Sequence, residues 1–280
     1  VSVSIDGKPA AIIDPWTKVH VAFATSKSPR VSFATYEVTG LKDWSRVDVV
    51  VDAGAAGRVE LRGMNVFGAT ALPDRGLNFL IGSCYSSIDA SLNGGELVKS
   101  PGALVDHVRK SSPGPKVAGL DATILLGDQV YLDLPPFQNA LKSEALADKL
   151  LAKYITNWFD DPNFATLLHS APILMIGDDH ELWNNAPFHQ WQICKTYSDQ
   201  GRKDWTKVAS DLYSAFQYGR TDAATPGRAT TQFMLPGLSM LAWDRRFERT
   251  RKQLASAQAF QELSQFVAQV AAGSDQHGAL

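Results

Sequence analysis

The chain has 280 residues, a formal net charge of -2 at pH 7, 45% hydrophobic residues and 20% charged residues. This composition is that of a globular protein with a sizeable core, long enough for one large domain or two smaller ones. The near-neutral charge and scattered basic residues give no nucleic-acid-binding surface, and no apolar run reaches the roughly 18 residues of a membrane span. Two cysteines, Cys84 and Cys194, are too few for a disulfide framework, and no signal peptide is evident.

Residues 1–75 are predicted to form β structure. Segments 19–23, 31–34 and 47–51 alternate or cluster apolar and β-branched residues, and Gly and Asp residues separate these runs. We predict a small immunoglobulin- or fibronectin-like β-sandwich domain over residues 1–75, followed by a second domain over residues 76–280.

From residue 76 the pattern changes to a repeated unit of buried strand, polar loop and helix. Predicted strands at 77–81, 122–126 and 173–176 alternate with predicted helices at 102–110 and 143–158. This alternation is typical of an α/β layer with a largely parallel sheet.

The last third of the chain carries two helical patterns around a strand-like stretch. Apolar residues share one helical face over 205–216 and again over 254–270, while 233–243 has the apolar character of strands. The expected fold class is therefore α/β, with the α/β region beginning near residue 76.

Each of the three apolar runs ends at a group of potential metal ligands. These groups are Ser83-Cys84, the segment from Asp128 to Asp133, and the segment 178–181 followed by Asn184 and Asn185. In open α/β sheets ligands bind beyond the carboxyl ends of the strands, so the three groups are predicted to meet there. A lone Cys after a strand is more often a small buried hydrophobe and Gly-Asp is often only a turn, but four consecutive ionisable residues are hard to explain as a plain loop.

These residue types suit metal-assisted hydrolysis of a phosphate ester. The reaction needs a hydroxide nucleophile and neutralisation of growing oxyanion charge, and two or more bound metals supply both. Carboxylates such as Asp128 can bridge two cations, and a Cys84 thiolate beside a Tyr131 phenolate indicates a softer or redox-capable metal. His180 can donate a proton to the leaving oxygen.

At these residues the sequence resembles the alkaline phosphatase D (PhoD-like) family of the calcineurin-like metallophosphoesterase superfamily. The matching motifs are Ser83-Cys84, Gly127-Asp128-x-x-Tyr131-x-Asp133, Asp178-Asp179-His180-Glu181-x-x-Asn184-Asn185 and Asp244-x-Arg246-x-x-Arg249. The resemblance implies a four-layer α/β/β/α sandwich after a β-sandwich domain, and hydrolysis of phosphodiesters or phosphomonoesters. Members are often exported, so the resemblance suggests an extracytoplasmic location, which the residues themselves leave open.

The resemblance also implies metals and roles for individual residues. The implied ferric ligands are Cys84, Asp128 and Tyr131. The implied calcium ligands are Asp128, Asp133 and one of Asn184 or Asn185. Mn²⁺, Zn²⁺ and Mg²⁺ are alternative ions, and Asp179 and His180 are the implied catalytic residues.

Two C-terminal features complete the set of candidates. The family pattern ends in a small-Asp-x-His motif, for which Asp275 and His277 are candidates. Their alternative is a solvated tail, in which case the chain is a fragment or lacks an intervening segment. Arg246 and Arg249 are candidates for binding substrate phosphate through a bidentate guanidinium, or else they begin a surface helix with ion pairs to Glu248.

Two other functions stay open from the sequence. One is a non-catalytic binding module on the same scaffold, with a degraded metal site. The other is a metal-dependent hydrolase or lyase that acts on a different bond, because a fold does not fix its substrate.

Overall fold

The computed structural model describes most of the α/β region and parts of the N-terminal region. The described residues are 2–5, 7–10, 12–13, 20–23, 31–33, 37–38, 46–52, 54–65, 77–85, 103, 107, 120–134, 143–168, 170–218, 229–235 and 238–277. The predicted helix at 102–110 lies outside them except for Ala103 and His107, which are helical.

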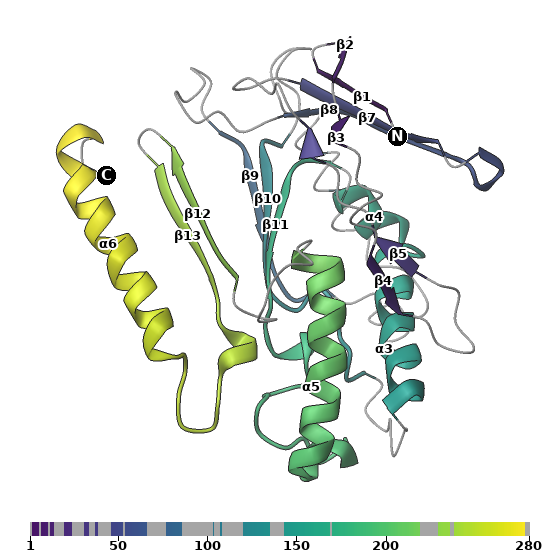
Figure 1. Ribbon diagram of the computed structural model, residues 1–280, viewed down its shortest axis with the longest axis vertical. Coiled ribbons are helices and arrows are strands. Elements are labelled where there is room, and N and C mark those ends of the chain that lie inside the picture. Colours follow the sequence, from purple (N-terminus) through teal and green to yellow (C-terminus); the bar gives the residue numbers. More distant parts are fainter. Residues whose placement is uncertain are drawn as a thin grey trace.

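Short antiparallel strands make up the N-terminal part of the described chain (Figure 1). One sheet has the order β2-β1-β7-β8 and consists of β1 (Ser2–Ile5), β2 (Lys8–Pro9), β7 (Arg46–Asp52) and β8 (Arg58–Asn65), with the 3-10 turn η2 (Gly54–Ala56) between the last two. Two further pairs are β3 (Ile12–Ile13) with β6 (Glu37–Val38), and β4 (His20–Phe23) with β5 (Val31–Phe33). These strands confirm the predicted β structure, whereas the β-sandwich and a domain boundary at residue 75 stay predictions.

A parallel sheet of order β11-β10-β9 forms the centre of the molecule. Its strands are β9 (Phe79–Gly82), β10 (Ala122–Leu126) and β11 (Ile173–Ile176). Both neighbours of β10 are parallel to it, with Leu125 opposite Gly82 on one side and Met175 on the other. The predicted parallel α/β layer is therefore confirmed, and the segments after the three strands emerge at one edge.

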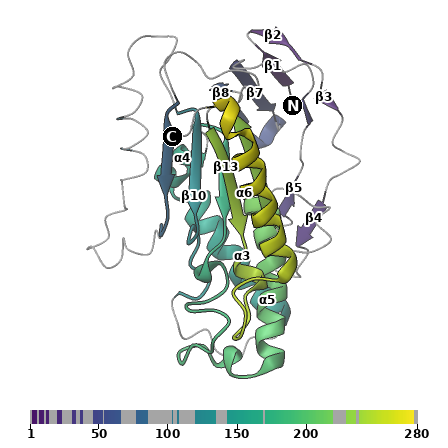
Figure 2. The ribbon, with the colours of Figure 1, turned by 90° about the vertical axis from the view of Figure 1, so that its left-hand side faces the viewer.

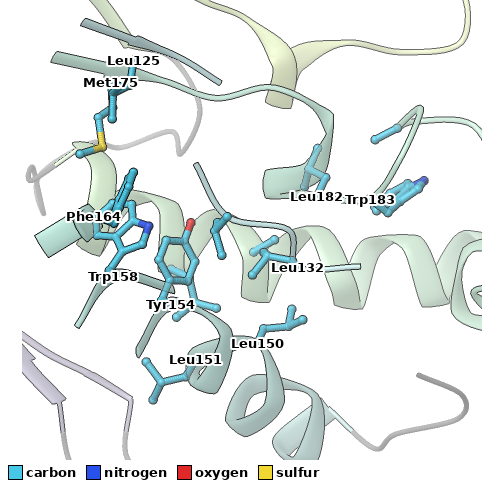
Figure 3. Close-up of a cluster of buried hydrophobic side chains, with 14 of the residues drawn as sticks. Leu125, Leu132, Leu150, Leu151, Tyr154, Trp158, Phe164, Met175, Leu182 and Trp183 are labelled. Carbon is cyan, nitrogen blue, oxygen red and sulfur yellow. The ribbon is translucent and has the colours of Figure 1, made fainter. Parts of the chain in front are cut away.

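Helices cover one side of this sheet (Figure 1). They are α3 (Ser143–Trp158), α4 (Pro162–Leu168) and α5 (Asp199–Tyr213), which continues into the π-helical turn η5 (Ser214–Tyr218). In α3, Leu146, Leu150 and Tyr154 recur at a spacing of four residues and are fully buried, so they form the apolar face of the helix. Figure 3 shows how α3 and α4 side chains pack with Leu125 and Met175 of the sheet to form the core.

A β-hairpin and a long helix lie on the other side of the sheet (Figures 1 and 2). The hairpin joins β12 (Ala229–Leu235) to β13 (Leu238–Asp244), and the 3-10 turn η6 (Arg246–Glu248) and helix α6 (Ala257–His277) follow. Trp243 of β13 contacts Phe260 of α6 edge-on, with ring centroids 5.6 Å apart. Because only two strands of this second sheet fall among the described residues, the four-layer sandwich stays a prediction.

None of the helices described here is both long enough and apolar enough to cross a membrane.

Candidate metal site

Backbone hydrogen bonds join the three loops that follow β9, β10 and β11. The Cys84 N–H donates to the Gly127 carbonyl at 3.1 Å, and the Tyr85 N–H donates to the Asp128 carbonyl at 2.9 Å. The Leu132 N–H donates to the carbonyl of His180 at 3.0 Å. The loops after β9 and β11 are therefore both hydrogen-bonded to the loop after β10. Side chains of the three loops converge, as the sequence predicted.

The convergent groups include a possible set of metal ligands. One ligand atom from each of Asp128, Asp179 and His180 lies within 4.8 Å of the other two. The Cys84 sulfur lies 3.4 Å from Oδ2 of Asp128, on the same cluster. Metal–ligand distances are about 2.0–2.6 Å, so atoms this close can share one cation. Asp128, Asp179 and His180 therefore fit a bound metal ion, and Cys84 adjoins this group through Asp128. The donor set does not choose between iron, calcium and another divalent ion.

The backbone at the cluster adopts an uncommon conformation. Cys84, Asp128 and Asn185 have φ values of 59°, 58° and 61°, and within the described part of the chain they are the non-glycine residues with positive φ. Such left-handed conformations cost about 1–3 kcal/mol each and persist where surrounding contacts determine them. The Asn185 N–H donates to Oδ2 of Asp179, which links the third of these residues to the cluster.

Asp133 contacts His180 through Nδ1 of the imidazole. Its Oδ1 lies 2.7 Å from Nδ1 of His180, and its Oδ2 accepts the Asn184 N–H at 3.0 Å. The Tyr131 ring lies against the imidazole, with centroids 4.1 Å apart. Burial lowers the pKa of His180, but the hydrogen bond and negative charge of Asp133 oppose it. Together with the charges of Asp128 and Asp179 they raise the pKa above its ordinary value. Asp133 therefore fixes the orientation of His180 and favours its protonated form.

The cluster carries an excess of acidic groups. Burial raises the pKa of Asp128, the His180 N–H lowers it, and the neighbouring charges of Asp179 and Asp178 raise it further. A cation placed among these carboxylates would relieve both the repulsion and the desolvation.

Arg246 supplies positive charge next to the cluster. Its guanidinium lies 3.2 Å from Asp178 and 3.2 Å from Asp179, and its side chain is 13% exposed. Arg246, which the sequence suggested as a residue that binds substrate phosphate, is thus paired with two carboxylates. The Arg249 N–H donates to the Arg246 carbonyl at 3.3 Å, which places its backbone beside the same turn.

Asp275 and His277 belong to the last turn of α6. Their side chains fall outside the part of the chain that the structure describes, so their role as ligands stays a prediction and is left out of the proposal below.

Two buried carboxylates beside the cluster were not assigned a role from the sequence. Glu181 occupies the 3-10 turn η3 (Asp179–Glu181), and burial raises its pKa to about 7 although backbone donors lower it. Asp244 accepts the Gly177 N–H at 3.1 Å and the Tyr213 hydroxyl, and burial raises its pKa to about 6. Both residues lie inside motifs that resemble those of the alkaline phosphatase D family, and this position was the sequence signal that could have identified them.

Comparison with known proteins adds evidence about the fold. No protein-family model matches the chain, and no curated protein matches its sequence. A solved structure described as "Structure of PhoD" resembles it with a TM-score of 0.50 and 16% identity, over 81% of this chain and 41% of that one. The chain thus spans less than half of that protein, and the similarity shows a PhoD-like α/β fold.

Proposed function

We propose that this chain hydrolyses phosphate esters, either phosphodiesters or phosphomonoesters, at a metal centre held by Asp128 and Asp179. The observation that carries the proposal is the convergence of Asp128, Asp179 and His180 at the carboxyl edge of a parallel sheet. The PhoD-like fold and the resemblance of the motifs to the alkaline phosphatase D family support it.

The charge of the site explains why metal is needed. Among the described residues, carboxyl groups outnumber cationic groups at the cluster and its immediate surroundings. The carboxyl groups include those of Asp128, Asp178, Asp179 and Asp133, and the cationic groups are Arg246 and a protonated His180. A phosphate ester is itself anionic, so this site would repel it without added positive charge. A bound cation neutralises phosphate charge and lowers the pKa of a coordinated water.

The protein groups have separate roles in the proposed reaction. Asp128 and Asp179 hold the cation, and Cys84 adds a sulfur ligand if the ion is iron. His180, which Asp133 orients and whose protonated form Asp133 favours, donates a proton to the leaving alkoxide. Arg246 holds Asp178 and Asp179 in place and offers positive charge at the edge of the site.

The identity of the metals is a finer proposal that rests on the sequence resemblance. It assigns a ferric ion to Cys84, Asp128 and Tyr131 and a calcium ion to Asp128 with Asp133 and an Asn184 or Asn185 side chain. The contact of Cys84 with Asp128 suits the iron assignment. Both Asp133 oxygens accept hydrogen bonds from His180 and Asn184, which suits a supporting role for Asp133 better than a ligand role.

The test combines metal content with turnover. Protein purified without added metal is analysed for bound elements and for visible absorption, and hydrolysis of bis(4-nitrophenyl) phosphate is measured for wild type and His180→Ala. We expect stoichiometric metal in both proteins and a loss of turnover of about 10²–10⁴-fold in the variant, as for removal of a general acid. Loss of metal in the variant would instead make His180 a ligand. A wild type with neither stoichiometric metal nor turnover would favour the binding-module alternative, and stoichiometric metal without turnover of this ester would favour a hydrolase or lyase that acts on a different bond.

A further inference from the structure

One buried carboxylate connects the two loops that carry the proposed metal ligands. Glu181 has no exposed surface. Its Oε2 accepts the N–H groups of Asp128 at 3.0 Å and Asp178 at 2.8 Å. Its Oε1 accepts the Gln129 N–H at 2.8 Å and the Gln217 side-chain amide at 3.1 Å. Four N–H donors thus converge on a single side chain.

These donors belong to segments that are distant in the sequence. Asp128 and Gln129 follow β10, Asp178 follows β11, and Gln217 belongs to η5. In the proposed function Asp128 and Asp179 hold the metal. The Asp128 N–H donates to Glu181, and Asp179 directly follows Asp178, whose N–H also donates to Glu181. The separation of their two carboxylates therefore depends on the backbone positions that Glu181 fixes.

Asp128 depends on this contact most directly. Its φ of 58° is a left-handed conformation that L-residues adopt at a cost of roughly 1–2 kcal/mol. The hydrogen bond from its N–H to Glu181 helps to hold that conformation, in which Oδ1 accepts the His180 N–H at 3.2 Å and Oδ2 faces Cys84. Without the acceptor, the strained backbone is free to relax and to carry the carboxylate away from Asp179.

Only a carboxylate of this length satisfies the arrangement. Gln at position 181 has one acceptor oxygen, so its NH₂ group would face at least one pair of N–H donors. Asp at this position is one methylene shorter and cannot reach both loops. Either change leaves buried backbone N–H groups without an acceptor, which is costly.

We propose that Glu181 is a positioning residue that sets the separation of Asp128 and Asp179 and thereby the affinity of the site for a divalent cation. This inference rests on the proposed function, since it concerns the same metal site. It assigns Glu181 no contact with substrate or metal. Partners in the outer shell of metal sites change affinity or activity by about 10–100-fold when they are replaced.

The first measurement uses wild-type protein without metal. Hydrogen exchange of assigned backbone amides should show Asp128, Gln129 and Asp178 to be strongly protected, because each donates to a buried acceptor. In Glu181→Gln the same three amides should exchange at least about tenfold faster while the amides of α3 keep their protection. This readout needs neither metal nor turnover, and fast exchange of the three amides in wild type would overturn the proposal even if no variant folds.

The second measurement is calorimetric titration with Mn²⁺, a hard cation that suits carboxylate ligands. Glu181→Gln should bind Mn²⁺ about 10–100-fold more weakly than wild type. The matched control is Asp121→Asn, since Asp121 is 1% exposed and accepts the Asn78 N–H at 2.7 Å at the opposite end of β10. This control should lose stability and keep the wild-type affinity.

The outcomes separate this inference from the proposed function. Equal Mn²⁺ affinity in wild type and Glu181→Gln overturns the positioning role and leaves the phosphoesterase proposal intact. A wild type that binds no Mn²⁺ or other metal overturns both. Two results together support the positioning role. Glu181→Gln binds Mn²⁺ more weakly than wild type while Asp121→Asn does not, and the amides of Asp128, Gln129 and Asp178 lose their protection in Glu181→Gln.

Discussion

Nδ1 of His180 lies 2.7 Å from Oδ1 of Asp133, and the two residues belong to loops that follow different strands of the parallel sheet. The Asp133 side chain is 2% exposed, so the interaction is shielded from solvent on that side. An imidazole held in this way presents its other nitrogen in a fixed direction. The pair is thus the structural basis of the proton-donor role that we propose for His180.

Replacing Asp133 with Asn should lower the pKa of His180. Asp133 raises that pKa through its hydrogen bond and charge, against the effect of burial. Without the charge, the imidazole loses its proton at a lower pH, and the decline of activity on the alkaline side should move to lower pH with it. NMR titration of the His180 ring in metal-free protein measures the pKa directly.

The control for this prediction is Asp161→Asn. Asp161 is also a buried carboxylate, but it accepts the Tyr85 hydroxyl and the Asn163 N–H at 2.9 Å instead of contacting His180. The His180 titration should be unchanged in this variant. An unchanged titration in Asp133→Asn as well would show that Asp133 does not set the protonation of His180.

Much of the α/β core could be predicted from the sequence. The strands 122–126 and 173–176 and the helix 143–158 begin and end at the predicted residues, because short apolar runs that stop at Gly and a buried stripe along a helix are local signals. The order β11-β10-β9 depends on contacts between distant segments, which no local pattern encodes.

The sequence predicted which residues come together at the candidate site but not how their side chains are oriented. The rule that loops meet at the carboxyl ends of parallel strands predicted the convergence of Cys84, Asp128 and His180. The orientation of each side chain depends instead on backbone conformations such as the positive φ of Asp128, which residue spacing does not reveal. For this reason the contact of Asp133 with His180 and the connecting role of Glu181 emerged only from the structure.

Replacing Arg246 with Ala should destabilise the metal-free protein by about 2 kcal/mol in chemical denaturation. The change leaves Asp178 and Asp179 side by side without the guanidinium that contacts both at 3.2 Å. The effect stays below the roughly 3–5 kcal/mol of a broken buried pair because Asp178 is 48% exposed. Saturating Mn²⁺ should reduce the loss, since the cation supplies the missing positive charge.

Lys207→Ala is the matched surface control for Arg246. Lys207 pairs with Asp211 at 2.8 Å on α5, and both side chains are well exposed, so its removal should change the free energy of unfolding by less than about 0.5 kcal/mol. If Arg246→Ala costs no more than this control, the ion pairs with Asp178 and Asp179 do not stabilise the site.

Metal binding should protect Cys84 from alkylation. Cys84 and Cys194 are both free and exposed, but only the Cys84 sulfur lies near the cluster, 3.4 Å from Asp128. Mn²⁺ or iron should slow the reaction of Cys84 with iodoacetamide several-fold, as followed by peptide mass spectrometry. Cys194 should react at the same rate with and without metal.

The variant Asp128→Asn provides the internal check on this protection. It weakens the proposed metal centre while leaving both thiols in place, so the metal should no longer slow the alkylation of Cys84. Equal protection of both cysteines in wild type would point to a general effect of metal on the protein, and the position of Cys84 at the centre would then be rejected.

Replacing Gly127 with Ala should damage the site far more than the same change at Gly57. Both glycines have positive φ, 101° and 111°, so Ala strains the backbone at either position by roughly 1–2 kcal/mol. At Gly57 an added Cβ meets nothing within 4 Å, whereas at Gly127 it lies 2.4 Å from Cβ and 3.0 Å from N of Asp178.

The overlap at Gly127 forces the loops after β10 and β11 apart. Gly127→Ala should therefore lose a further ~1–3 kcal/mol of unfolding free energy. It should also bind Mn²⁺ at least about tenfold more weakly, because Asp128 and Asp179 lie on the separated loops. Calorimetric titration and urea denaturation of both variants give the comparison, and equal losses at the two positions would mean that the close approach of Gly127 to Asp178 does not shape the metal site.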